Sequence, residues 1–108
     1  MKELHRNGQD LTAGLEGRLD AMSADEFTRQ MEVWFAAGLK NFAIDCSHLD
    51  YISSAGLRAL LMAAKKLKSL NGSFKLAALQ ESVDNVFKIS GFDKIIPIAA
   101  TLDDACKS

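Results

Sequence analysis

The chain has 108 residues, of which 48% are hydrophobic and 25% are charged. This length fits one domain, residues 1–108, with a single core and no room for a large cofactor domain. A net charge of −1 and an isoelectric point near 6.1 argue against nucleic acid as a partner. The chain shows no apolar run suited to direct membrane insertion, no secretory signal and only two cysteines, so we expect a cytoplasmic protein.

The first third of the chain predicts two strands and a helix. Apolar and polar residues alternate over residues 11–19, which indicates a strand with one buried face. An Asn7-Gly8 turn precedes it and leaves a poorly specified edge strand before the turn. Ser23 and Glu26 match a capping box, so we expect a helix from Ser23 to about Gly38.

A second alternating strand is predicted over residues 42–46, followed by a polar loop over residues 47–53. A helix then begins at Ser54 and ends before Asn71-Gly72. Its buried stripe should consist of Leu57, Leu60, Leu61, Ala64 and Leu67.

The rest of the chain, from residue 74 on, predicts a strand over residues 74–78 and a short helix ended by Gly91. An edge strand over residues 95–98 and a helix cap at Thr101 follow. This order of elements predicts an α/β fold with a mixed, mostly parallel sheet of about four to five strands. Because the strong strands alternate, the helices should lie mainly on one face.

Two hydroxyls stand where the second strand pattern stops and the helical pattern starts, at Ser53 and Ser54. A phosphate added there would meet the free N–H groups and the positive end of a helix. A serine that simply caps the helix fits the same spacing. Asp20 also has two interpretations: an aspartate that ends its strand or precedes a helix, or a functional residue.

Several of these segments resemble the STAS domain of bacterial anti-sigma factor antagonists. The resemblance lies in Tyr-Ile-Ser-Ser-Ala-Gly-Leu at residues 51–57, in Ile-Asp-Cys-Ser-His-Leu at 44–49, in Gly-Arg-Leu-Asp at 17–20, and in the element order over about residues 11–104. In that family, the serine two residues before the glycine is phosphorylated by a partner anti-sigma factor that is also a serine kinase. The resemblance therefore implies Ser54 as the phosphorylated residue, two residues before Gly56.

The same resemblance assigns the residues around this serine. Ser53 stands where the family usually has aspartate and is the alternate phosphorylation site, and Asp20 corresponds to the aspartate near the phosphosite. The implied protein is a binding module, not an enzyme. Unphosphorylated, it would sequester the anti-sigma factor and release sigma factor. Phosphorylated, it would dissociate until a PP2C-type phosphatase resets it.

A second reading stays open beside this one. A STAS domain can serve as a subunit of a transport or stress-sensing complex, in which the serine is not a phosphorylation switch.

The partner would also contact the helix that follows Ser54. At helical spacing from this serine, an adaptable methionine is flanked by cations, which gives the predicted contact residues Arg58, Met62, Lys65 and Lys66. A solvated lysine face with one exposed methionine is the alternative interpretation.

Metal binding and catalysis find little support in the sequence. Cys46 and His48 are two ligands without a second pair, and a core cysteine with a surface histidine explains them. Ser54 lacks the Gly-x-Ser-x-Gly elbow of a hydrolase. We therefore expect no metal, no cofactor and no catalytic residue.

Overall fold

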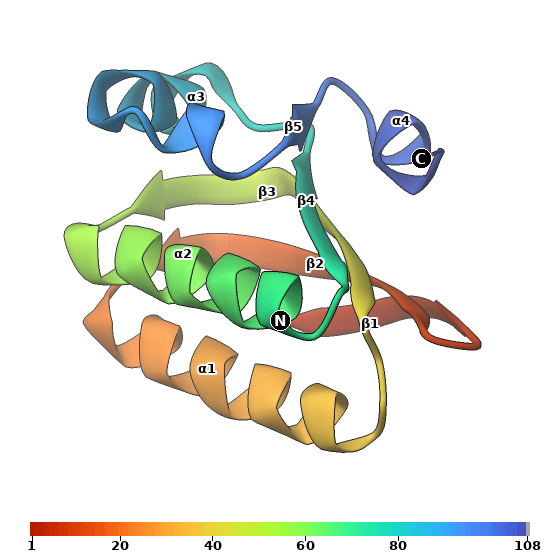
Figure 1. Ribbon diagram of the computed structural model, residues 1–108. Coiled ribbons are helices and arrows are strands. Elements are labelled where there is room, and N and C mark those ends of the chain that lie inside the picture. The colour runs from red at the N-terminus through yellow and green to blue at the C-terminus, as the bar shows by residue number, and fades with distance from the viewer. Residues whose placement is uncertain (108) are drawn as a thin grey trace.

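The computed structural model describes residues 1–107, so Ser108, the last residue of the predicted domain, lies outside the described residues. The chain alternates between strands and helices from β2 onward (Figure 1). In chain order the elements are β1 Lys2–Asn7, β2 Asp10–Leu19, α1 Ala21–Ala36, β3 Asn41–Ile52, α2 Ser54–Ser69, β4 Ser73–Ala77, α3 Glu81–Ser90, the 3-10 helix η1 Phe92–Lys94, β5 Ile98–Ala99 and α4 Leu102–Cys106.

The strands form one five-stranded sheet in the order β1-β2-β3-β4-β5. Strand β1 pairs with β2 antiparallel, and every later neighbour pairs parallel. This arrangement confirms the predicted mixed, mostly parallel sheet. Because Leu19 pairs with Ile52, strands β2 and β3 end at the same edge. Helices α1 and α2 begin just beyond that edge.

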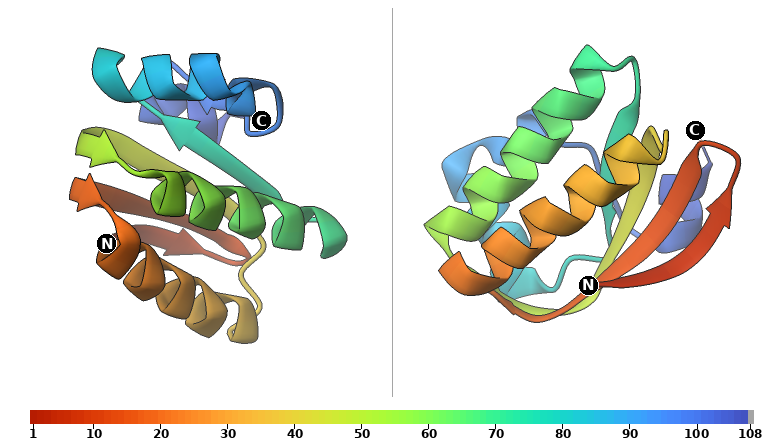
Figure 2. Two further views of the ribbon diagram at one scale, coloured as in Figure 1. Left: turned by 90° about the vertical axis from the view of Figure 1, so that its left-hand side faces the viewer. Right: turned by 90° about the horizontal axis from the view of Figure 1, so that it is seen from below.

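The two faces of the sheet are covered unequally. Phe42, Ile44 and Leu76 pack into the main core with α1, α2 and α3, whose side chains include Val83 and Phe87. The alternate residues Ala43 and Ala77 point to the other face and pack on Ala105 of α4. The predicted placement of the helices mainly on one face is confirmed. Figure 2 shows α1 and α2 side by side across that face.

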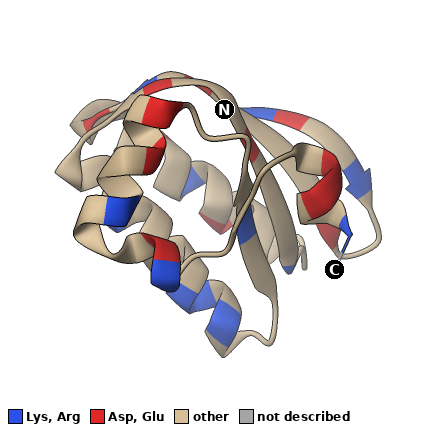
Figure 3. Ribbon diagram, turned by 90° about the horizontal axis from the view of Figure 1, so that it is seen from above, with Lys and Arg blue, Asp and Glu red and all other residues tan. Residues whose placement is uncertain are grey.

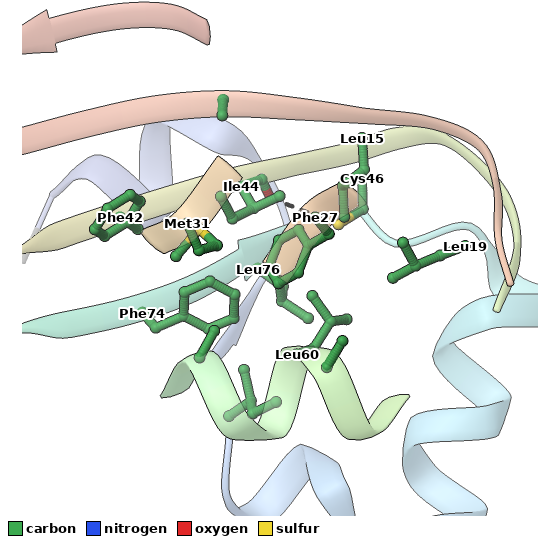
Figure 4. Packing of buried hydrophobic residues seen from close by; sticks show 14 of the residues in the cluster. Leu15, Leu19, Phe27, Met31, Phe42, Ile44, Cys46, Leu60, Phe74 and Leu76 are labelled. Carbon is green, nitrogen blue, oxygen red and sulfur yellow. Dashed lines mark hydrogen bonds between the residues drawn. The ribbon is translucent and has the colours of Figure 1, made fainter. Parts of the chain in front are cut away.

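Side chains from both layers meet in the main core (Figure 4). Phe27 of α1 contacts Phe74 of β4 edge-on, with ring centroids 6.5 Å apart. Trp34 and Phe35 pack on Phe42 at 6.0 and 5.9 Å. Burial of each large apolar side chain contributes about 1.5–3 kcal/mol, so this cluster anchors α1 and α2 on the sheet.

The predicted end of the second strand at residue 46 is wrong. Strand β3 continues to Ile52, and no separate loop covers residues 47–53. The pairing with β2 shifts twice along this stretch, between Gly14 and Glu16 and between Gly17 and Arg18, with the extra residues on β3. Such bulges interrupt the alternation of apolar and polar residues while the strand goes on.

The predicted start of the first helix at Ser23 is also wrong. Helix α1 begins at Ala21 with Asp20 as its N-cap, and Ser23 is the third helical residue of the capping box. The capping motif exists, but it begins three residues earlier, at Asp20, which follows the strand directly. Aspartate is as favourable at the N-cap position as serine is.

The buried stripe of α2 is shifted from the predicted one. Leu60 and Leu67 are buried as expected, but Leu57, Leu61 and Ala64 are only half-buried. The other buried positions are small residues, Gly56, Ala59 and Ala63, which let α2 approach its neighbours closely.

The last strand is shorter than predicted. It comprises Ile98–Ala99, and Ile95 is exposed after η1. Pro97 precedes the strand at the sheet edge, where its missing N–H breaks no ladder hydrogen bond. Its carbonyl oxygen accepts a hydrogen bond from the Leu76 N–H at 3.0 Å.

Candidate functional site

The starts of α1 and α2 are joined through a single backbone carbonyl, that of Leu19 at the end of β2. This oxygen accepts from the Ser53 N–H at 3.0 Å and from the Ser53 hydroxyl at 3.1 Å. Because Asp20 follows Leu19 directly, the two N-cap residues lie at the same edge of the sheet. The candidate site is this shared edge.

Ser53 is the cap of α2. Its side chain accepts from the Gly56 N–H at 3.1 Å while donating to Leu19. The residue is half-buried, and its hydroxyl is occupied both as donor and as acceptor. This hydroxyl therefore holds the helix in place.

Ser54 is the first residue of α2 and is exposed. Its hydroxyl makes no hydrogen bond with any residue from 1 to 107. The Gly56 and Leu57 N–H groups are taken up by Ser53, whereas those of Ser54 and Ala55 have no acceptor within the same residues. An anion attached to Ser54 would therefore lie at the positive end of α2 beside free donors.

Gly56 is needed for the close approach of α2 to β2. A Cβ atom at this position would overlap the carbonyl oxygen of Leu19 and would lie 3.0 Å from side-chain carbons of Ile52 and Leu19. Any side chain here would push α2 away from the Leu19 carbonyl. The structure thus gives the glycine of the motif a packing role.

Asp20 is committed to the first turn of α1. Its carboxylate accepts from the Ser23 N–H at 3.2 Å and lies 3.0 Å from the Ser23 hydroxyl. These hydrogen bonds lower the pKa of Asp20, first through the backbone N–H and then through the hydroxyl. Among residues 1–107, no hydrogen bond links Asp20 to Ser53 or Ser54. The structure brings these three residues to one edge, and the link between the two helix starts is the Leu19 carbonyl, which Ser53 contacts through its N–H and its hydroxyl.

The same edge carries groups that the sequence interpretation missed. The Arg18 guanidinium lies 4.0 Å from the centre of the Tyr51 ring, a cation–π contact across β2 and β3. Met22, in the first turn of α1, is 76% exposed. Residue 51 was expected in a loop, so its pairing opposite Arg18 was hidden. An apolar residue two positions after the Asp20 cap was the available signal for Met22.

The predicted contact residues all lie on the surface of α2. Arg58, Met62, Lys65 and Lys66 are exposed, Met62 to 62%. Helix α2 also contains Lys68 and has no acidic residue. All charged residues on its exposed side are therefore cations.

Cys46 and His48 take the places expected of them. Cys46 is fully buried in the core, and burial raises the pKa of its thiol to about 12, so the thiol stays protonated at neutral pH. His48 is exposed. No helix within residues 1–107 is long and apolar enough to cross a membrane.

Comparison with known proteins places the chain in a family. The model of the STAS domain matches residues 1–105, and the chain belongs to this family. The resemblance seen in the sequence motifs is thereby confirmed.

Two curated relatives carry names that describe antagonism of an anti-sigma factor, not a catalysed reaction. BtrV of Bordetella bronchiseptica, named as a candidate anti-sigma factor antagonist, is 37% identical over 95 residues, which cover 88% of this chain and 82% of BtrV. The anti-sigma-B factor antagonist of Bacillus subtilis is 30% identical over 98 residues, which cover 91% of this chain and 89% of that protein.

Solved structures confirm the fold. The anti-sigma factor antagonist SpoIIAA in its unphosphorylated form superposes with a TM-score of 0.84, over 97% of this chain and 91% of that chain, at 19% sequence identity.

Proposed function

We propose that this chain is a cytoplasmic anti-sigma factor antagonist whose binding is switched by phosphorylation of Ser54. The two curated relatives named for antagonism support the class of function. The observation that carries the switch is the difference between the two serines. The Ser53 hydroxyl is tied to Leu19 and Gly56, whereas the Ser54 hydroxyl is exposed at the start of α2.

In the proposed cycle, the unmodified protein binds an anti-sigma factor that is also a serine kinase, and sigma factor is released. The kinase transfers a phosphoryl group from ATP to the Ser54 oxygen. A new oxygen–phosphorus bond forms, ADP leaves, and the hydroxyl proton passes to a base of the kinase. A PP2C-type phosphatase hydrolyses the phosphoester and restores the hydroxyl.

Charge is the physical basis of the switch. A phosphoryl group adds about −1.5 to −2 charges at pH 7, and the start of α2 tolerates them because free N–H groups point toward them. The protein therefore stays folded. A partner surface fitted to a neutral hydroxyl must instead desolvate a dianion, which costs several kcal/mol, and each 1.4 kcal/mol is about tenfold in affinity.

The proposed partner surface extends from Ser54 along α2. Arg58, Lys65 and Lys66 supply cations around the exposed Met62. Phosphorylation places a negative charge at the end of this cationic surface, so the partner meets a changed potential as well as a larger group.

Service in a transport or stress-sensing complex, with an unmodified serine, is the alternative function. The names of the curated relatives favour the anti-sigma factor antagonist. The alternative predicts that a charge at residue 54 has no specific effect on an anti-sigma factor.

The proposal is tested with Ser54→Ala and Ser54→Asp. Each anti-sigma factor with a serine kinase domain from the source genome is purified, and its affinity is measured by calorimetry. We expect Ser54→Ala to bind like the wild type and Ser54→Asp to bind about tenfold or more weakly. Ser82→Asp, the same change at an exposed serine in the first turn of α3, is the matched control and should bind normally. Equal binding by both Ser54 variants would refute charge gating.

A further inference from the structure

A groove runs between α1 and α2 on the face away from the sheet. Its floor is formed by Met31 of α1 and by Ala59 and Ala63 of α2, all of which are buried. Thr28 and Met62 line it from the two helices. The groove exists because α2 presents small residues at positions i and i+4 toward α1, so the two helices leave a hollow above their contact.

The size of the groove fits one protein side chain. Its volume is about 170 Å³. Pockets for free ligands usually hold about 300–1,000 Å³, so this hollow is too small for a metabolite of ordinary size. Met62, 62% exposed beside an apolar floor, forms an adaptable wall for an apolar group.

The charges around the groove indicate what kind of surface covers it. Helix α2 carries four cations and no acid, whereas the rest of the chain has nine Lys and Arg against 14 Asp and Glu. Lys66 lines the α2 side of the groove and Glu32 lines the α1 side. Figure 3 shows the charged residues on the ribbon. A partner surface that is acidic over α2 complements this pattern.

A second copy of the chain is a poorer occupant. Two α2 helices placed face to face would bring two sets of four cations together, and such like charges repel. An acidic partner meets no such penalty.

We propose that this groove receives one apolar side chain from an acidic surface of the anti-sigma factor. The inference rests on the proposed function and extends the contact along α2. At 1.5 Å per residue, the groove extends along α2 from Ala59, about 7.5 Å beyond Ser54, to Lys66, about 18 Å beyond it. The groove contact is therefore separate from the serine and contributes equally whether residue 54 is neutral or charged.

Thr28→Trp tests the inference by filling the groove from an exposed position of α1. Its matched control is Val33→Trp, which adds the same ring at another exposed, uncharged position of α1 that does not line the groove. Circular dichroism and thermal unfolding verify that both variants are folded. Affinity for the purified anti-sigma factor is then measured for each variant, alone and combined with Ser54→Ala or Ser54→Asp.

We expect Thr28→Trp to weaken binding about 10- to 100-fold, the equivalent of one buried side chain, and Val33→Trp to bind normally. The affinity ratio between the two Ser54 variants should be the same in both backgrounds. Normal binding by Thr28→Trp would overturn the groove while the serine switch stands. Equal affinities of Ser54→Ala and Ser54→Asp would overturn the proposed function itself. Self-association of the wild type that Thr28→Trp abolishes would assign the groove to a second copy and contradict the inference.

Discussion

At the scale of single residues, two adjacent serines have different surroundings because only Ser53 contacts the Leu19 carbonyl, 34 positions earlier in the chain. Sequence patterns place both Ser53 and Ser54 at a helix start, and a serine at either position could cap the helix. Only the structure shows that Ser53 reaches the Leu19 carbonyl while Ser54 points to solvent. This distinction depends on how β2 and β3 pair, which local spacing does not contain.

The two hydroxyls should therefore differ in their contribution to stability. Ser53→Ala removes the helix cap and should lower the free energy of unfolding by about 0.5–2 kcal/mol. Ser54→Ala removes an exposed hydroxyl and should change it by less than about 0.5 kcal/mol. Urea denaturation of both variants measures the difference. A loss in Ser54→Ala as large as that in Ser53→Ala would show that Ser54 has a structural role instead.

At the scale of elements, periodicity and caps predicted the helices and the central strands, together with the start of α2 at Ser54 and the end of α3 at Gly91. The end of β3 and the start of α1 were misplaced. Strand β3 was predicted too short because its bulges opposite β2 disturb the alternation. Helix α1 was predicted to start late because Asp20 and Ser23 form one capping box and only Ser23 was assigned to it. The buried stripe of α2 was predicted from its leucines alone, but three of its five buried positions are the small residues Gly56, Ala59 and Ala63.

The close approach of α2 to β2 predicts a specific effect of Gly56→Ala. The added methyl group would overlap the Leu19 carbonyl, so the free energy of unfolding should fall by about 1–3 kcal/mol. The start of α2 should shift with it, and affinity for the anti-sigma factor should fall. Urea denaturation and calorimetry measure the two effects.

Gly72→Ala provides the matched control. Gly72 lies in the turn that follows α2, far along the helix from Ser54. A methyl group at this position would overlap the Lys40 carbonyl. Gly72→Ala should lower the free energy of unfolding by a similar amount, and the folded variant should bind the anti-sigma factor with unchanged affinity. A Gly56→Ala variant as stable as the wild type would contradict the contact on which the geometry of Ser53 and Ser54 depends.

At the scale of the whole molecule, the sequence predicted the fold, but only part of the surface that we propose for the partner. Alternating strands and amphipathic helices determine a mixed sheet with helices mainly on one face, because each apolar face must be covered. The exposed residues of α2 were predicted, but the groove was not. It needs α1 and α2 side by side, and no local pattern reports that contact.

The architecture also explains how a switch can work without a change of fold. Ser54 lies at the surface where α2 begins, and the core below it is formed by buried residues. A charge at Ser54 therefore alters what a partner meets and leaves the packing of the sheet and helices intact.

The most direct test compares the unmodified chain with a chain that carries phosphoserine at position 54, in calorimetric titrations against the purified anti-sigma factor. The account predicts that the unmodified chain binds and that the phosphorylated chain binds at least about 100-fold more weakly, since desolvation of a dianion costs several kcal/mol. Circular dichroism spectra of the two forms should coincide. Equal affinities, or weak binding caused by unfolding of the phosphorylated chain, would contradict the claim that Ser54 is a local charge switch.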